Sequence, residues 1–364
     1  MSDLQIIEES DDPGPCWDTF VAAHSTGHLM QSRAWAAVLR DIGWTPFFLR
    51  IEERGAIQAV ALLIRWRPLG CLPGLLYIPR GPVLDYANPE VCRIFATALS
   101  QVARRERACF IQTDPAVPAE RSDVHARLES MGFDRIDKQG LFRIAQPLRV
   151  MRVPLDRYNG PEGLWVALPH KTRYNIGLAS RKEVRVVRRT DRGGCLDFHR
   201  MLKETGRSKG FLVRGLRFHE SLWRHCVQPG HGEYLFAEHA GRPLAAIHLL
   251  RFGTRTWYMY GATAAEERHR MAPYLLHWEG ISRAWAIGST SYDMRGVYSA
   301  TPRPGDPEYG VFDFKRKFNA EMTTFLGEYD RIERPVAYRA WRRLESALQR
   351  PVGLAFRLLR AGRR

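Results

Sequence analysis

The sequence predicts a mixed α+β protein made of two related domains placed side by side. The chain has 364 residues, of which 45% are hydrophobic and 26% charged, and this globular composition at this length favours two domains over one. Strand-like and helix-like patterns alternate through roughly the first 150 residues, as in α/β or α+β domains. The second half then repeats the order of helices, hairpin, helix and strand.

The first half predicts two helices, a hairpin, a broken strand, a long helix, a short strand and a last helix. Ser32 is a suitable N-cap for the second helix, Asn88 for the long one, and Gly132 closes the last. A turn at Arg54-Gly55 joins the hairpin strands, and prolines break the next strand at 79–82. In chain order, these segments begin at residue 15 and then cover 32–43, 45–53, 55–68, 75–85, 88–108, 109–115 and 120–136.

The second half predicts a similar series, and its hairpin at 236–251 matches the first-half hairpin at 51–65. A helix closed by Gly288 and a strand follow that hairpin, and a basic helical tail follows Pro335. In chain order, the predicted helices and strands cover 196–211, 217–229, 232–263, 272–289 and 290–297.

The stretch "FDFKRKF" (312–318) combines three phenylalanines with three cations. The phenylalanines have the even spacing of one strand face, while Lys315 and Lys317 fall on the other. Two interpretations stay open. The stretch is a half-exposed strand with its cations in water, or it is a wall of a site that holds something anionic.

The sequence lacks the signatures of several classes of protein. No uncharged apolar run reaches the length of about 18 residues that a spanning helix needs, and the acidic N-terminus does not resemble a secretory signal. No nucleotide-binding glycine loop, metal-ligand spacing or serine-hydrolase motif occurs. Six separated cysteines predict buried thiols in a reducing compartment: Cys16, Cys71, Cys92, Cys109, Cys195 and Cys226.

The charge predicts an anionic partner. The formal net charge is +16, and the isoelectric point is about 9.9. Residues 331–364 contain ten arginines and two glutamates, which is half of the total net charge. RNA, DNA, a membrane surface or a phosphorylated metabolite would fit this balance, and so would an arginine-rich proteome with no such partner.

Individual residues at predicted element ends could carry chemistry. Arg80 lies in the stiff stretch "YIPRGPVLD" and suits a phosphate or carboxylate, or a surface salt bridge. Asp114 ends a strand before Pro115, where it faces a cleft or only forms a turn. Arg214 precedes a helix, where it could clamp an anion. Tyr258 and Tyr260 share one face of a predicted strand, which is either the core face or the cleft face.

A basic helix edge forms another candidate surface. The stretch "LPHKTRYNIGLASRK" has four cations, and it predicts either an edge that contacts RNA or phosphate or a plain solvated helix. The four are Lys171, Arg173, Arg181 and Lys182.

Nine segments together resemble the FemAB family of non-ribosomal peptidyl transferases. They occur in family order and cover nearly the whole chain. They are "QSRAW" (31–35), "IPRGPVLD" (78–85), "IQTDP" (111–115), "HKTRYNIGLASRKEVRV" (170–186), "KGFLVR" (209–214), "WYMYGAT" (257–263), "YDMRGV" (292–297), "FKRKF" (314–318) and "GEYD" (327–330).

The resemblance implies two tandem acetyltransferase-like (GNAT-like) domains with a cleft between them and no helical coiled-coil arm. Domain 1 would cover 1–150, completed by the C-terminal segment 328–364, and domain 2 would cover 151–327. The implied reaction moves an amino acid from aminoacyl-tRNA, the co-substrate, to an amine of a peptidoglycan stem peptide carried by lipid II or a UDP-linked precursor. It needs no cofactor and no metal, and it places the protein in the cytoplasm.

The resemblance also implies roles for residues. Lys315 would lie near the reacting ester as an oxyanion partner, with Asp114 across from it to orient or deprotonate the incoming amine. Arg80, Arg214 and Tyr260 would surround the phosphates and sugar of the acceptor, with Tyr258 nearby. Phosphate contacts to tRNA would come from the helix edge at 171–189, Arg316, Lys317 and the basic tail.

Two positions depart from the family pattern. A phosphate-binding lysine expected after the first-helix tryptophan is Leu39, and the adjacent Arg40 is a candidate substitute. A tyrosine expected after Arg214 is Phe218, which keeps the ring and loses the hydroxyl. Both changes concern the headgroup of the acceptor.

The sequence also leaves three other functions open. The same fold could form an amide on a peptide natural product, again from aminoacyl-tRNA. A CoA-dependent N-acyltransferase would carry a glycine-rich pyrophosphate loop, and Pro273 stands where that loop would have glycine. A non-catalytic nucleic-acid binder would use the basic tail, whose apolar stripe could instead touch the inner membrane face. That stripe consists of Leu344, Leu348, Leu354, Phe356 and Leu359.

Overall fold

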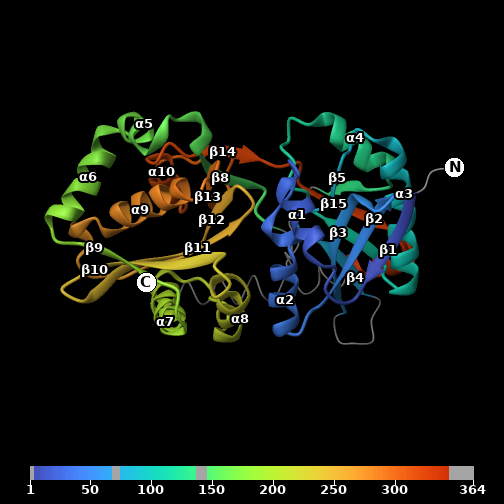
Figure 1. Cartoon of the computed structure of the whole chain (residues 1–364), viewed down its shortest axis with the longest axis horizontal. Coiled ribbons are helices and arrows are strands. Elements are labelled where there is room, and N and C mark those ends of the chain that lie inside the picture. The colour runs from blue at the N-terminus through green and yellow to red at the C-terminus, as the bar shows by residue number, and fades with distance from the viewer. Residues whose placement is uncertain (1–3, 68–73, 137–145, 344–364) are drawn as a thin grey trace. The chain divides into compact units, whose positions relative to one another are not determined.

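A computed structural model describes residues 4–67, 74–136 and 146–343 of the chain. It divides into two compact units, each with its own mixed sheet (Figure 1). Unit 1 comprises residues 1–146 and 325–364, and unit 2 comprises residues 147–324. The domain boundaries predicted after 150 and 327 differ from these by about four residues or fewer.

Unit 1 has a sheet in the order β1-β2-β3-β4-β6-β15-β7, with β5 paired to β3. Among the described strands of this sheet, only β4 and β6 run parallel to each other. The chain returns late to add β15 between β6 and β7. The elements are β1 (Leu4–Glu9), α1 (Pro15–Ala23), α2 (Arg33–Asp41), β2 (Thr45–Glu53), β3 (Ala56–Trp66), β4 (Leu75–Ile78), β5 (Val83–Leu84), α3 (Pro89–Arg105), β6 (Phe110–Thr113), α4 (Ser122–Ser130), β7 (Asp134–Ile136) and β15 (Glu328–Ile332).

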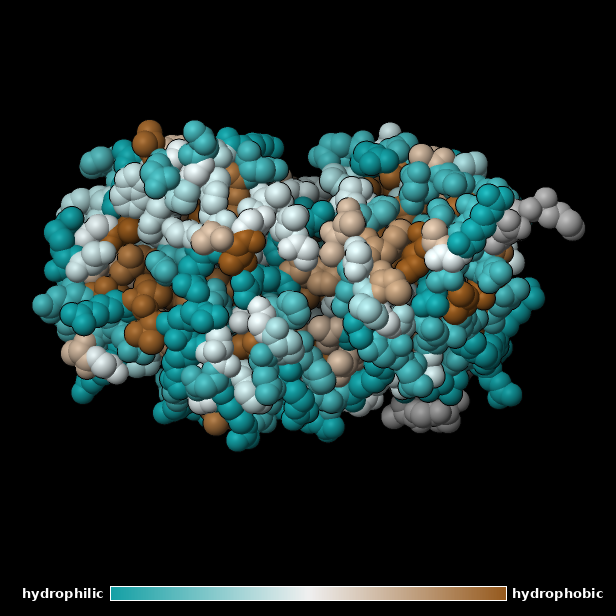
Figure 2. All heavy atoms as spheres, in the orientation of Figure 1, coloured by the Kyte–Doolittle hydropathy of each residue, from teal (hydrophilic) through white to brown (hydrophobic). Residues whose placement is uncertain are grey.

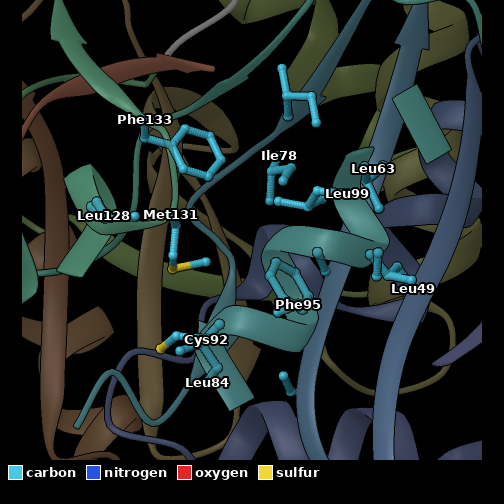
Figure 3. Packing of buried hydrophobic residues seen from close by; sticks show 14 of the residues in the cluster. Leu49, Leu63, Ile78, Leu84, Cys92, Phe95, Leu99, Leu128, Met131 and Phe133 are labelled. Atoms are coloured by element: carbon cyan, nitrogen blue, oxygen red, sulfur yellow. The ribbon is translucent and has the colours of Figure 1, made fainter. Parts of the chain in front are cut away.

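The core of unit 1 lies between the sheet and α3. Alternate strand residues such as Leu49 and Leu63 face Phe95 and Leu99 of this amphipathic helix, and all four are fully buried (Figure 3). The opposite sheet face is covered by α1, whose Trp17 packs edge-on against Phe48 with ring centroids 4.8 Å apart. Helices therefore cover both faces of this sheet.

Unit 2 has a sheet in the order β14-β8-β13-β12-β11-β10-β9, in which β12 and β13 are parallel. Helix α9 packs on one face with α5 and α6 beyond it, and α7 and α8 lie on the other face (Figure 1). The elements are β8 (Arg149–Pro154), α5 (Gly160–Ala167), α6 (His170–Arg181), β9 (Arg185–Arg189), α7 (Arg192–Lys209), α8 (Leu216–Leu222), β10 (Gly232–His239), β11 (Arg242–Phe252), β12 (Arg255–Thr263), α9 (Ala272–Ala286), β13 (Ser291–Val297), α10 (Tyr309–Arg316) and β14 (Glu321–Thr324).

The two matched hairpins have the same turn. In β2–β3 the turn residues Arg54 and Gly55 have φ of 50° and 79°, and in β10–β11 Ala240 and Gly241 have φ of 48° and 75°. Two successive positive φ values define the two-residue turn whose twist suits a hairpin. The repeat predicted from sequence therefore extends to the backbone conformation of these turns.

Two predictions about local structure are wrong. Residues 312–318 form no strand, because α10 runs through them and ends at Arg316. Phe314 lies in α10 and Phe318 in the turn just after it, and their rings pack on each other with centroids 5.3 Å apart. Among the predicted buried thiols, Cys16 is exposed, while Cys71 lies outside the described residues.

The tail is described only in its first part. Tyr338 and Trp341 pack against Phe110 of β6, with ring centroids 5.1 and 6.1 Å away. The apolar stripe predicted from Leu344 onward lies outside the described residues. No helix within the described ranges is long and apolar enough to cross a bilayer.

Candidate active site

A buried lysine, Lys315, is the centre of the candidate site, which lies in unit 2. Its side chain is 5% exposed, and Nζ donates hydrogen bonds to the carbonyls of Arg295 (3.2 Å) and Gly296 (2.8 Å). Phe314 and Phe318, which precede and follow Lys315 in sequence, pack against His277 of α9. These contacts place this part of α10 against the interior of the unit. The ammonium group is thus held inside the unit by carbonyl oxygens rather than by carboxylates.

The two carbonyls are aimed at Lys315 by an irregularity in β13. The pairing of β13 with β8 shifts between Asp293 and Gly296, and Arg295 has φ of 65°. Asp293 supports this conformation because one oxygen accepts from the Arg295 amide (2.7 Å) and the other from Arg152 Nε (2.9 Å). Asp293 therefore positions the carbonyls that hold Lys315.

Burial makes this lysine easier to deprotonate. Desolvation lowers the pKa of Lys315 to about 8, partly opposed by Asp293. Desolvation also lowers the pKa of the neighbouring His277 to about 3, and the charge of Lys315 adds to that effect. His277 is therefore neutral near pH 7, whereas Lys315 is an ammonium group at pH 7 that loses its proton around pH 8.

Lys315 lines a cavity of about 550 Å³ between the sheet and the helices α9 and α10. The parallel strands β12 and β13 pair only from Arg255 with Ser291 to Trp257 with Asp293, and then separate. Tyr258 and Met294, the next residue on each strand, line the cavity. Figure 2 shows apolar side chains gathered at the surface over α9. The separated strands thus leave room for a ligand group beside a buried cation.

The two predicted tyrosines lie on opposite faces of the sheet, so the prediction that they share one face is wrong. Tyr258 contacts His277 of α9, whereas Tyr260 contacts His219 of α8 on the other face. The cause is a bulge, since the pairing of β12 with β11 skips Met259. Tyr258 lines the Lys315 cavity, and Tyr260 belongs to a separate cluster.

That second cluster joins Arg214, Phe218 and Tyr260. The guanidinium of Arg214 lies over the ring of Phe218, 4.6 Å from its centroid, and Phe218 meets Tyr260 edge-on. Burial raises the pKa of Tyr260, and the charge of Arg214 partly opposes this. The structure therefore brings together three predicted acceptor-binding residues.

In unit 1, Asp114 and Arg80 form a buried polar node where the parallel strands β6 and β4 end. Asp114 accepts from the Arg80 amide (2.8 Å), from Tyr77 Oη (3.0 Å) and from the Gln146 amide. Burial raises the pKa of Asp114. Arg80 is 1% exposed with φ of 56°, and its guanidinium lies 4.2 Å from the ring centroid of Phe325. Asp114 and Arg80 thus hold together the loop after β4, the loop after β6 and the chain at Gln146 and Phe325.

Arg40 holds the N-terminal segment of unit 1. Its Nη2 donates to the carbonyls of Ser10 (2.6 Å) and Asp11 (3.3 Å), and its guanidinium lies over Phe48. The neighbouring Leu39 is buried. Arg40, the candidate substitute for the lysine expected at position 39, therefore contacts the main chain before α1.

The predicted tRNA-binding cations divide into two groups. Arg173 donates to the carbonyls of Val166 (2.7 Å) and Leu168 at the end of α5, and Lys182 Nζ donates to His269 O (2.8 Å). Arg173 therefore stabilises the end of α5, and Lys182 stabilises the loop that contains His269. Arg181, exposed at the end of α6, lies over the Tyr174 ring.

The other three cations gather where α6 begins and α10 ends. Thr172 Oγ1 donates to Lys317 O (3.0 Å), which brings the exposed Lys171 next to the end of α10. Arg316 and Lys317 both pair with Asp313, which lies three and four residues earlier in α10. A patch of three cations thus lies at the end of the helix that carries Lys315.

The sequence alone does not identify His277 or Asp293 as site residues. His277 interrupts the apolar stripe of α9 in "APYLLHWEGI", which was a weak signal because a buried histidine is more often a core residue than a functional one. Asp293 sits in "YDMRGV" and has no distinguishing spacing. Their relation to Lys315 appears only in three dimensions.

Comparison with known proteins gives a consistent result. The model of the FemAB family matches residues 16–139 and 232–346. Lipid II:glycine glycyltransferase of Staphylococcus aureus is 25% identical over 86% of this chain and 90% of that protein. The crystal structure of FemX superposes with a TM-score of 0.81 at 23% identity, covering 89% of this chain and 97% of FemX. A tandem GNAT protein from the clavulanic acid pathway has a TM-score of 0.55 at 11% identity, covering 91% of this chain and 98% of that protein. Two tandem GNAT-like domains are therefore the fold.

Proposed function

The chain belongs to the FemAB family, and from this premise we propose that it transfers an amino acid from aminoacyl-tRNA to an amine of a peptidoglycan stem peptide. The acceptor is lipid II or its UDP-linked precursor, and the product is an interpeptide bridge. The glycyl transfer to lipid II named for the staphylococcal relatives supports this reaction class.

The observation that carries the proposal is Lys315 in its cavity. In the reaction, the acceptor amine attacks the ester carbonyl, a C–N bond forms and the C–O bond to the terminal ribose breaks. One proton passes from the amine to the ribose oxygen. An aminoacyl ester is already activated, so the protein must align the two groups and stabilise the oxyanion.

Lys315 is suited to that task. An ammonium group has three N–H donors, and two of those of Lys315 bond to the carbonyls of Arg295 and Gly296. The third is available to an oxyanion or to the leaving ribose oxygen. Because the group is buried, its charge is weakly screened and its position is fixed before the substrate arrives. No enzyme nucleophile is required.

The remaining predicted residues divide between the two substrates. We assign the cluster of Arg214, Phe218 and Tyr260 to phosphate and sugar of the acceptor. The patch of Lys171, Arg316 and Lys317 suits the phosphates of the tRNA acceptor stem, through counterion release. Asp114 has both oxygens occupied by hydrogen-bond donors, which supports a positioning role more than a direct proton transfer.

The test is transfer in vitro with purified protein and a pool of radiolabelled aminoacyl-tRNAs. UDP-linked pentapeptide and lipid II are offered separately as acceptors, and a parallel reaction supplies labelled acetyl-CoA instead of tRNA. Label in either cell-wall acceptor supports the proposal and names both substrates. Label from acetyl-CoA only identifies a CoA-dependent N-acyltransferase. Binding of aminoacyl-tRNA without transfer to either acceptor would point to a peptide natural product.

A further inference from the structure

The connection between α7 and α8 presents large apolar side chains to solvent. Leu212 is 85% exposed, Phe211 45% and Leu216 37%, all within six residues. Single exposed apolar residues are common, but three in one short connection form a patch that calls for a partner. None of the three takes part in the Lys315 cavity.

Hydrogen bonds and packing fix the main chain of this connection, so the exposed position of Leu212 is set by the fold. The amides of Gly210 (φ 73°) and Phe211 both donate to Gly206 O, at 2.8 and 3.1 Å. Val213 packs on Gly206 so closely that a Cβ there would lie 2.6 Å from Val213 Cγ2. The turn thus packs the half-buried Val213 against α7 and leaves the side chain of Leu212 in solvent.

Cations surround this apolar tip. Residues 200–217 contain six Lys or Arg and one Glu, a net charge of +5. A groove of about 310 Å³ runs along α7 beside the tip, with Leu196 and Leu216 as apolar lining and Arg200, Lys203 and Arg207 as cations. Glu204 also lines it, and Arg200 pairs with Asp197. In Figure 2, the surface over α7 and α8 is mostly hydrophilic.

We infer that this 200–217 surface docks the protein onto an anionic phospholipid bilayer. Phe211 and Leu212 enter the interface, and the cations of α7 meet lipid phosphates. An RNA backbone would also attract the cations, but it would leave an aliphatic tip in water. The combination of Leu212 with a net charge of +5 therefore favours a lipid surface over a nucleic acid.

This docking surface gives the proposed function a location. Arg214 lies in the same connection and also in the cluster assigned to the acceptor. Docking at 200–217 would hold that cluster at the membrane, where a lipid-linked stem peptide is presented. To that extent the inference rests on the proposed function, although membrane binding itself can be measured without any transfer.

The experiment is vesicle sedimentation of the full chain. Vesicles of equal parts phosphatidylglycerol and phosphatidylcholine are compared with vesicles of phosphatidylcholine alone. The tip variant is Phe211→Ser with Leu212→Ser, and the charge variant is Lys203→Glu with Arg207→Glu. Val166→Ser is the matched control, because Val166 is 75% exposed and lies in α5, outside both the 200–217 surface and the basic tail. Circular dichroism checks that every variant is folded.

We expect the wild type and Val166→Ser to bind the anionic vesicles equally, and more weakly as salt rises. The tip variant should lose at least fivefold in binding, and the charge variant should lose the preference for anionic vesicles. Equal binding of all variants would overturn the inference and leave any membrane contact to another part of the chain. It would also be overturned if the charge variant kept vesicle binding and lost tRNA binding instead.

Transfer to the UDP-linked acceptor is measured on the same preparations. We expect the tip variant to keep wild-type transfer to this water-soluble acceptor while losing transfer to lipid II in anionic vesicles. A wild type that binds vesicles through 200–217 but transfers nothing would refute the proposed function and leave the docking surface standing. A tip variant equally active on both acceptors would refute the docking role.

Discussion

The two units handle the same structural feature in different ways. Within the described residues each has one parallel strand pair, β4–β6 in unit 1 and β12–β13 in unit 2. In unit 1 the loops after the strands are tied by Asp114, which accepts three hydrogen bonds, and by Arg80 stacked on Phe325. In unit 2 the strands separate around a cavity of about 550 Å³ that contains Lys315.

The difference shows how a repeated fold can divide its tasks. A polar group whose partners are all protein atoms stabilises a loop conformation and has little left to offer a substrate. A buried ammonium group with a spare donor beside a cavity can act on a ligand. We therefore expect changes at Lys315 to affect transfer and changes at Asp114 to affect mainly stability.

The largest expected effect is the loss of transfer in Lys315→Met. Met has a similar length and no charge, so it removes the oxyanion donor while filling most of the space. Transfer should fall about 10²–10³-fold, as when one oxyanion donor is lost elsewhere. Initial rates on the active acceptor measure it. Lys317→Met, which removes a half-buried cation paired with Asp313, is the matched control and should lose far less. Comparable losses in both would mean that Lys315 serves only to attract tRNA.

The same lysine should make stability depend on pH. Its pKa is lowered from 10.5 to about 8 in the folded protein, so between these values the unfolded chain binds more protons. Stability therefore rises with pH over this window, by about 3 kcal/mol at most. Urea unfolding of wild type and Lys315→Met at pH 8 and pH 10.5 isolates the contribution of Lys315 to the free energy of unfolding. The contributions of other titrating groups cancel when the two proteins are subtracted at each pH. If the difference in unfolding free energy between the two proteins did not change with pH, Lys315 would not be a buried charge in the folded state.

Asp114→Asn tests the other half of the comparison. The amide cannot accept from the main-chain N–H groups of Arg80 and Gln146 at the same time, so one donor is left buried without an acceptor. The expected loss of stability is about 1–3 kcal/mol, measured by urea unfolding. The surface variant Asp123→Asn should leave the melting temperature unchanged. If Asp114→Asn instead stayed as stable as wild type and lost transfer as Lys315→Met does, Asp114 would be a catalytic base.

Two glycines distinguish the packed and open sides of the cavity. A Cβ at Gly261 would lie 2.0 Å from Tyr258 Oη, whereas a Cβ at Gly310 meets nothing within 4 Å. Gly261→Ala should lose about 1–3 kcal/mol of stability by overpacking, and Gly310→Ala should be neutral or stabilise α10. Thermal unfolding compares the pair. Equal stability would mean that Tyr258 moves freely and that the cavity is not bounded by it.

Much of the fold could be predicted from the sequence because local signals were strong. The long helix α3 has an Asn cap and a clear apolar stripe, and both hairpins have two alternating strands around a two-residue turn. Helix α10 was missed because three phenylalanines over seven residues fit a strand as well as a helix. What decided the outcome was packing of Phe314 and Phe318 on His277, a contact far away in sequence.

The site was only partly predictable for a similar reason. Lys315 and the cluster around Arg214 were found from a family resemblance, and the structure shows what surrounds them. The bulge at Met259 could not be inferred from alternation, and it moves Tyr260 away from Tyr258. Arg173 looked like a free cation, although it bonds to the end of α5. Sequence identifies the charged groups, but only packing shows which ones are already used.

The smallest expected effect tests how closely the two units repeat each other. Arg54 and Ala240 occupy the same turn position with φ near 50°, a left-handed conformation that costs a residue with a Cβ roughly 1–2 kcal/mol. Asn tolerates this conformation and precedes Gly in the preferred hairpin turn. Arg54→Asn and Ala240→Asn should each gain about 0.5–1 kcal/mol, and the double variant should gain the sum, since the turns lie in different units. Urea midpoints at constant slope provide the measurement. If only one variant gained stability, the two hairpins would share a backbone conformation but not its energy. Neighbouring side chains would then determine the strain of each turn.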